Sequence, residues 1–199
     1  MQFKIRNTQI VIGFPFAAAV TLLLLIDRSG TAVAAFAFCA VHEAGHLLAL
    51  FCFSAPPEAV VFGPFGMRID RGDKPLSYNC EAVCAFAGPA ANFVSALLML
   101  VLGGRFAALA RFAPLDAGIG VFNMLPVEPM DGGTALRSLL LLRFDERSAE
   151  RVLNILTAVL LVPLTVCGVF LLVKSGGNFT LLAVSVYIIL YILMKKRAA

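Results

Sequence analysis

Residues 32–53 read AVAAFAFCAVHEAGHLLALFCF, an apolar run long enough to cross a lipid bilayer. Apart from two cysteines, its ionisable side chains are His42, Glu43 and His46. A polar group in hydrocarbon costs free energy unless a partner or an ion offsets that cost, so packing does not explain these three residues. The run therefore predicts a metal site inside a membrane span.

The spacing of the three residues is typical of a zinc site. On a helix, residues i and i+4 share one face, so His42 and His46 can present two ring nitrogens to one zinc ion, with Glu43 beside the open coordination position. Zinc lowers the pKa of a bound water to about 7, and a neighbouring carboxylate can act as general base toward a peptide carbonyl. The pattern predicts a metallopeptidase with one zinc ion per chain. The alternative is a pair of core histidines that bond backbone carbonyls.

Composition places the rest of the chain in the membrane as well. Hydrophobic residues make up 60% of the 199 residues and charged residues 14%, and the mean hydropathy is +0.92. These values are far from those of soluble globular domains. We predict an all-α polytopic membrane protein with about six transmembrane helices, at residues 9–26, 32–53, 80–102, 106–125, 151–173 and 178–194. The fourth is interrupted by Arg111, Pro114 and Asp116, which have to face a cavity or an interface.

The segments between these spans leave no room for a separate domain. Residues 54–79 and 126–150 are each shorter than the ~50 residues that a domain usually needs. We therefore predict a single transmembrane metalloprotease domain over residues 1–199. Its core covers residues 32–142, and the spans at 9–26, 151–173 and 178–194 flank that core.

The basic residues predict the orientation in the membrane. With six spans, twelve of the sixteen Lys and Arg residues fall on one side, which places both termini in the cytoplasm. An alternative for the first span is a cleaved signal peptide. The net charge of +4 results from this bias and would attract the chain to anionic lipid. The sequence shows no basic patch for nucleic acid.

A third metal ligand has to come from elsewhere in the chain, because catalytic zinc takes three protein ligands and a water. The best candidate is Asp131, within residues 123–133, NMLPVEPMDGG. Two prolines prevent a regular helix there, and two glycines permit tight turns. Irregular backbone at membrane depth is tolerated where it lines a water-filled cavity, which hydrolysis requires. The alternative is a loop in which Asp131 caps a helix at about 134–142.

A second polar group lies in the predicted span 80–102, where residues 88–92 read GPAAN. Gly88 and Pro89 let a helix kink and let another helix approach closely, and Asn92 points an amide into the bundle. Small-residue packing with one interhelical hydrogen bond explains the motif equally well.

The three motifs occur in the order and span placement of the site-2 protease family of intramembrane zinc metalloproteases (peptidase M50), and the layout most resembles the stage IV sporulation branch, which processes pro-sigma factors. The resemblance covers about Phe38 to Gly133. It implies that Asp131 is the third zinc ligand, that Glu43 is catalytic, and that Asn92 and Asn123 lie near the centre to orient substrate or stabilise an oxyanion. It also implies a broken helix at the active site. No PDZ or CBS domain, which many members carry, is expected in this chain.

Residues 59–70 are predicted to form a short membrane-associated β-hairpin, with a turn at 63–66. Its unpaired edge could receive an unwound substrate segment as a further strand. A hairpin that connects two helices is the alternative.

The predicted function is that of a zinc-dependent intramembrane endopeptidase in a bacterial cytoplasmic membrane. Its partners would be the lipid bilayer, a membrane-embedded or membrane-tethered protein substrate such as a pro-sigma or anti-sigma factor, and membrane regulator proteins. Two alternatives are a catalytically inactive zinc-binding adaptor and a metal transporter. A transporter would show ionisable groups along a path or an inverted repeat of the spans, and the sequence shows neither.

Overall fold

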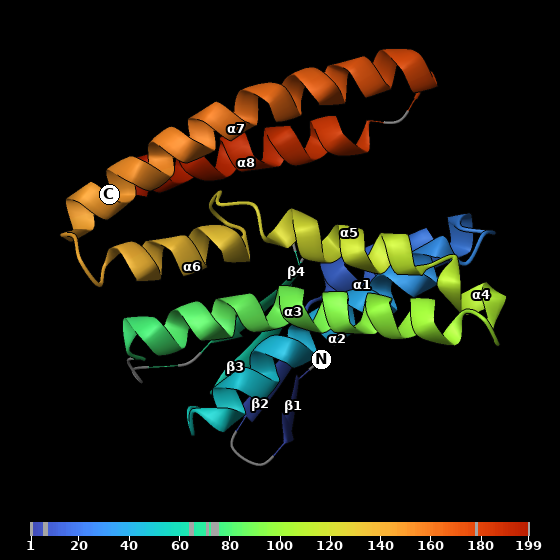
Figure 1. Ribbon diagram of the computed structural model, residues 1–199, viewed down its shortest axis with the longest axis horizontal. Helices are drawn as coiled ribbons and strands as arrows, with labels where there is room; N and C mark the ends of the chain where they lie inside the picture. Colours follow the sequence, from blue (N-terminus) through green and yellow to red (C-terminus); the bar gives the residue numbers. More distant parts are fainter. Residues whose placement is uncertain are drawn as a thin grey trace. The chain divides into compact units, whose positions relative to one another are not determined.

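The computed structural model describes residues 2–5, 8–63, 66–70, 72, 76–177 and 179–198. The chain divides into two compact units, Met1–Asn123 and Met124–Ala199, and each is described by itself (Figure 1). The division falls inside the predicted core 32–142. That the two units act as one domain stays a prediction.

The first unit is built around helices α2 (Thr31–Cys52), α3 (Tyr78–Leu102) and α5 (Ala113–Asn123), with α3 packed against both of the others. The Ser77 hydroxyl caps the start of α3 by accepting a hydrogen bond from the backbone amide of Cys80, and Glu81 in the first turn complements the helix dipole. Pro89 lies within α3 and is buried. The middle of α3 is therefore the part that α2 and α5 cover.

Helices α2 and α3 approach each other closely at Gly45. A methyl group on Gly45 would lie 2.4 Å from the carbonyl oxygen of Ala87 and 2.9 Å from the Cβ of Ala91. The backbones of the two helices therefore lie close together here, as small residues allow between membrane helices. The glycine of the His-Glu-Ala-Gly-His motif is thus explained by helix packing rather than by chemistry.

We expect Gly45→Ala to destabilise the protein, because the added methyl group has to push α2 away from a backbone atom of α3. Overpacking of this kind typically costs about 1–3 kcal/mol. Thermal unfolding of the purified protein in detergent would measure it. Gly118→Ala on α5 is the matched control, because a methyl group there meets nothing within 4 Å. Equal unfolding temperatures for the Gly45 variant and the wild type would contradict the expectation.

A four-stranded sheet accompanies these helices, in the order β1 (Gln2–Ile5), β2 (Thr8–Ile12), β3 (Ala59–Gly63), β4 (Gly66–Asp70). The β1–β2 and β3–β4 pairs are antiparallel, and the β2–β3 pair is parallel, with Gln9 opposite Ala59. The predicted hairpin at 59–70 is thus confirmed, although residues 64–65 of its turn lie outside the described residues. The other two strands were not predicted, so the all-α description needs a small sheet added to it.

Within the described part of the chain, three helices are long and apolar enough to cross a membrane, namely α2, α3 and α7 (Glu146–Ser175). Two predicted spans differ from the structure. Residues 9–12 of the first belong to strand β2, which leaves the 13-residue helix α1 (Phe14–Ile26). The fourth is divided between α4 (Ala107–Ala110) and the 11-residue helix α5. Helices α1 and α5 are both shorter than the ~20 residues of a straight span. A total of six crossings therefore stays a prediction.

The second unit contains α6 (Asp131–Leu140), α7 and α8 (Thr180–Ala198), and α7 and α8 lie side by side (Figure 1). Arg137 of α6 pairs with Glu146 of α7 at 2.5 Å. Asp145 caps α7, and the hydrogen bonds that it accepts from Ser148 hold the pKa of its carboxyl below the usual value. An apolar cavity of about 340 Å³ lies between α7, α8 and residues 125–127.

Candidate metal centre

His42 and His46 lie one turn apart on α2, as their spacing predicts. Their Nε2 atoms are 3.1 Å apart, and the two rings meet edge to face with centroids 4.8 Å apart. His42 is buried, with 6% of its surface exposed, and His46 is half-buried. Both imidazoles thus point their Nε2 atoms toward the same point.

The other nitrogen of each ring has an acceptor on α3. His42 Nδ1 lies 2.6 Å from Asn92 Oδ1, and His46 Nδ1 lies 2.7 Å from the carbonyl oxygen of Cys84. The orientation of the Asn92 amide follows from its other partners: its Nδ2 donates to the carbonyl oxygen of Phe38 at 3.0 Å and to Asp116 Oδ1 at 2.7 Å. Both histidines therefore carry their hydrogen on Nδ1.

This arrangement fits a metal ion. A neutral histidine with its hydrogen on Nδ1 has a lone pair on Nε2, so two lone pairs face each other across 3.1 Å. Two acceptors at that distance repel unless a cation or a proton lies between them. Two nitrogens bound to one tetrahedral zinc at about 2.1 Å would be roughly 3.4 Å apart, close to the distance seen. Hydrogen bonds from Nδ1 to outer acceptors are also usual for zinc-binding histidines.

Gly88 provides the space in which the two rings lie. A methyl group at this position would be 2.3 Å from His46 Nε2 and 2.9 Å from His42 Cε1. The sequence had suggested that Gly88 allows helix approach. Its stronger role in the structure is to leave room for the imidazoles themselves.

The other predicted site residues of the first unit are Glu43, Asn123 and Asn92, and they come from three different helices. Glu43 follows His42 on α2 and is half-buried. Asn123 ends α5, where its Nδ2 donates to the carbonyl oxygen of Ile119 at 3.0 Å. Asn92 is fully buried, and both hydrogens of its amide are used. This geometry favours a positioning role for Asn92 over the predicted contact with substrate.

Asp131 is the first residue of α6 in the second unit, after the irregular segment 124–130 that the prolines predict. The two glycines that follow it pack against this segment. A methyl group on Gly132 would lie 2.2 Å from the carbonyl oxygen of Met124, and one on Gly133 would lie 2.7 Å from the carbonyl oxygen of Val127. The predicted break between two helices is thus confirmed, and the glycines hold the segment against the start of α6. The helix begins at Asp131 rather than at the predicted 134.

Sequence reasoning missed the part that Asp116 plays in the histidine network. Asp116 had been noted as an interruption of the fourth span, but its carboxylate is fully buried and accepts hydrogen bonds from Asn92 and from the Ser95 hydroxyl. An acidic residue in an apolar segment signals a buried partner. The identity of that partner depends on how α5 packs on α3, which the sequence does not show.

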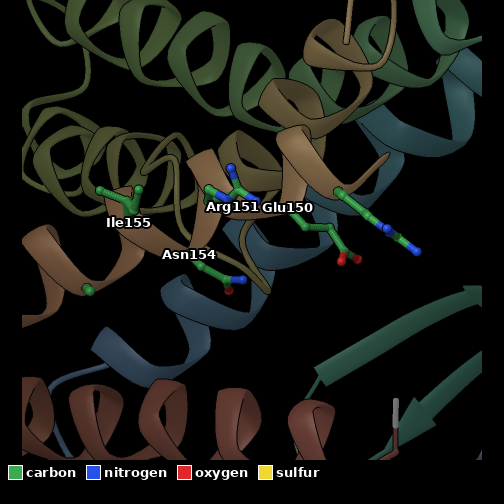
Figure 2. A pocket seen from close by; sticks show the side chains of 6 residues that line it. Glu150, Arg151, Asn154 and Ile155 are labelled. Atoms are coloured by element: carbon green, nitrogen blue, oxygen red, sulfur yellow. The ribbon is translucent and has the colours of Figure 1, made fainter. Parts of the chain in front are cut away.

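A separate hollow of about 540 Å³ lies along the first turns of α7 in the second unit. Figure 2 shows Glu150, Arg151, Asn154 and Ile155 along this helix, and Arg147 and Ala158 complete its lining. Two of the basic residues that predict the cytoplasmic side of the membrane, Arg147 and Arg151, therefore lie together at the start of a helix of spanning length.

A known sequence and a solved structure, both from Methanocaldococcus jannaschii, resemble the chain. A scan against models of protein families matches none of them. A zinc metalloprotease is 28% identical over 107 residues, which are 50% of this chain and 31% of that protein, so the match spans about a third of the relative's length. A solved site-2 protease superimposes with a TM-score of 0.66 over 94% of this chain and 91% of that chain, at 22% identity. The chain therefore has the fold of that site-2 protease.

Proposed function

We propose that the chain is a zinc-dependent intramembrane endopeptidase of the site-2 protease family. The observation that carries the proposal is the pair of histidines on an apolar helix of spanning length, whose Nε2 atoms face each other at 3.1 Å while acceptors hold both Nδ1 atoms. Likeness in sequence to a zinc metalloprotease and in fold to a site-2 protease supports it.

The proposed ligands are His42, His46 and Asp131, with one zinc ion per chain. Two imidazoles and a carboxylate are a donor set that catalytic zinc sites use, with a fourth position left for water or substrate. Bound zinc would supply a Lewis acid that acidifies water and polarises a peptide carbonyl. Asp131 follows an irregular segment, and such a segment at membrane depth fits a water-filled cavity.

The protein's own residues would move the proton. Glu43 takes a proton from the attacking water, whose oxygen forms a bond to the carbonyl carbon, and passes it to the amine as the carbon–nitrogen bond breaks. Asn123, at the end of α5, is proposed to orient the substrate or to donate to the developing oxyanion. Asn92 holds the His42 ring instead.

The proposed substrate is a membrane-embedded or membrane-tethered protein, with a pro-sigma or anti-sigma factor as the class that the sequence resemblance suggests. An extended substrate segment could pair with β4, which is an edge of the sheet formed by the described strands. We propose in addition six crossings of a bacterial cytoplasmic membrane with both termini in the cytoplasm, which the distribution of basic residues supports.

Removal of zinc should abolish cleavage, and one equivalent of zinc per chain should restore it. The purified full chain in detergent would be treated with 1,10-phenanthroline and incubated with tagged candidate membrane substrates before and after zinc addition. The non-chelating isomer 1,7-phenanthroline is the control. Cleavage that survives a measured loss of zinc would contradict the proposal. Zinc flux into proteoliposomes without any cleavage would favour a transporter instead.

A further inference from the structure

Asp116 on α5 is a carboxylate with no exposed surface, in a segment that is otherwise mostly apolar. Each of its oxygens has a donor on α3: Asn92 Nδ2 lies 2.7 Å from Oδ1, and the Ser95 hydroxyl donates to Oδ2. A buried carboxylate is costly unless hydrogen bonds compensate for it, so its presence calls for a reason beyond packing.

The contacts form a chain that leads from Asp116 through the Asn92 amide to His42. An asparagine side chain can present its oxygen or its nitrogen in either direction, so the neighbours decide which way it points. Here Asp116 Oδ1 and the carbonyl oxygen of Phe38 are both acceptors, and they hold the nitrogen end of Asn92. The oxygen end is left for His42 Nδ1.

A reversed amide would change the histidine. Its oxygen would face two other acceptors, and its nitrogen would donate to His42 Nδ1. The ring would then carry its hydrogen on Nε2, where the lone pair for a metal is needed. The acceptor at position 116 therefore bears on which nitrogen of His42 can bind a metal.

We propose that Asp116 is a positioning residue that selects the metal-binding tautomer of His42 by fixing the orientation of Asn92. The inference rests on the proposed function in one respect, that His42 binds the metal. It does not depend on peptide hydrolysis, so metal binding can test it separately. The requirement is for a hydrogen-bond acceptor at this position rather than for a negative charge.

The test compares Asp116→Leu, which removes the acceptor, with Asp116→Asn, which can accept from Asn92 and donate to Ser95. Zinc affinity of the full chain in detergent would be measured by competition with a chromogenic chelator. We expect the leucine variant to bind about 10–100-fold more weakly than wild type. The asparagine variant should stay within about threefold of wild type, because one good hydrogen bond is kept at each end.

A double-mutant cycle with Asn92→Ala shows whether the effect passes through Asn92. In that background Asp116→Leu should weaken zinc binding by less than about twofold, because residues that act through one another are not additive. Full additivity would overturn the proposal, as would wild-type affinity in a folded leucine variant or equal losses in the leucine and asparagine variants.

The tautomer can also be read in the wild-type chain, should the leucine variant not fold. The chain has two histidines, so ¹⁵N-histidine labelling gives two sets of ring signals. We expect zinc-free wild type at pH 8 to show His42 with its hydrogen on Nδ1, and Asp116→Asn to show the same. A hydrogen on Nε2 in the wild type would overturn the inference. Loss of cleavage activity alone would not overturn the inference, because cleavage tests the proposed function and not the orientation of Asn92.

Discussion

Glu43→Gln is expected to abolish peptide cleavage while zinc stays bound. The carboxamide has nearly the shape of the carboxylate but cannot take a proton from water, and general-base catalysis contributes about 10²–10⁴-fold to rates of this kind. Glu43 is not among the proposed ligands, so the metal affinity should change little. We therefore expect kcat to fall by about 10³-fold with KM within about twofold of wild type.

The measurement pairs single-turnover cleavage of a tagged membrane substrate with the zinc content of the same preparation. Glu146→Gln is a matched control, because the exposed pair that Glu146 forms with Arg137 should contribute little to stability. A glutamine variant at position 43 that cleaves normally would show that Glu43 is not the base. Loss of zinc together with cleavage would make Glu43 a ligand or a structural residue. If wild type and variant supported the same cellular function without cleavage, the chain would be an adaptor.

The long helices could be predicted from the sequence because hydrocarbon leaves a backbone few alternatives to an internally bonded helix. Predicted spans 32–53, 80–102 and 151–173 correspond to α2, α3 and α7 within five residues at each end. The largest difference is at the start of α7, where the helix begins at Glu146. Its polar first turn lies outside the apolar run, so a hydropathy pattern misses it.

The sheet and the broken fourth span could not be predicted in the same way. Residues 8–12, TQIVI, continue into the apolar residues of α1, and a short apolar run does not distinguish a strand from the start of a helix. What makes this segment a strand is the pairing of Gln9 with Ala59, fifty residues away. A pattern read over neighbouring residues therefore cannot reveal this pairing partner.

In the candidate metal centre, too, some features follow from the local sequence and others depend on residues far away in the chain. The two histidines are four residues apart on one helix, so their spacing alone brought them together. Asn92 was expected near the centre, but its role follows from Phe38 and Asp116, which lie 54 and 24 residues from it. A residue pattern can therefore propose donors for a metal, whereas the groups that orient those donors come from helix packing.

The space at Gly88 supports the second large prediction, that Gly88→Ala will remove zinc binding without unfolding the protein. The added methyl group would lie 2.3 Å from His46 Nε2, 2.6 Å from His46 Cε1 and 2.9 Å from His42 Cε1, far inside normal contact. The rings cannot simply swing aside, because the carbonyl oxygen of Cys84 and the Asn92 amide hold their Nδ1 atoms. One ring has to leave its position, and a metal ligand is then lost.

We expect zinc affinity in Gly88→Ala to fall by more than about 100-fold, beyond the effect of losing an outer hydrogen bond, and cleavage to fall with it. Alanine has about 1 kcal/mol better helix propensity than glycine, which should offset part of the strain, so α3 should still form. Gly118→Ala makes the same chemical change in open space on α5 and should bind zinc as wild type does. Competition with a chromogenic chelator and thermal unfolding would be measured on all three proteins. Wild-type zinc affinity in a folded Gly88→Ala protein would mean that the metal is bound elsewhere, because a centre made of these two imidazoles has no room for that methyl group.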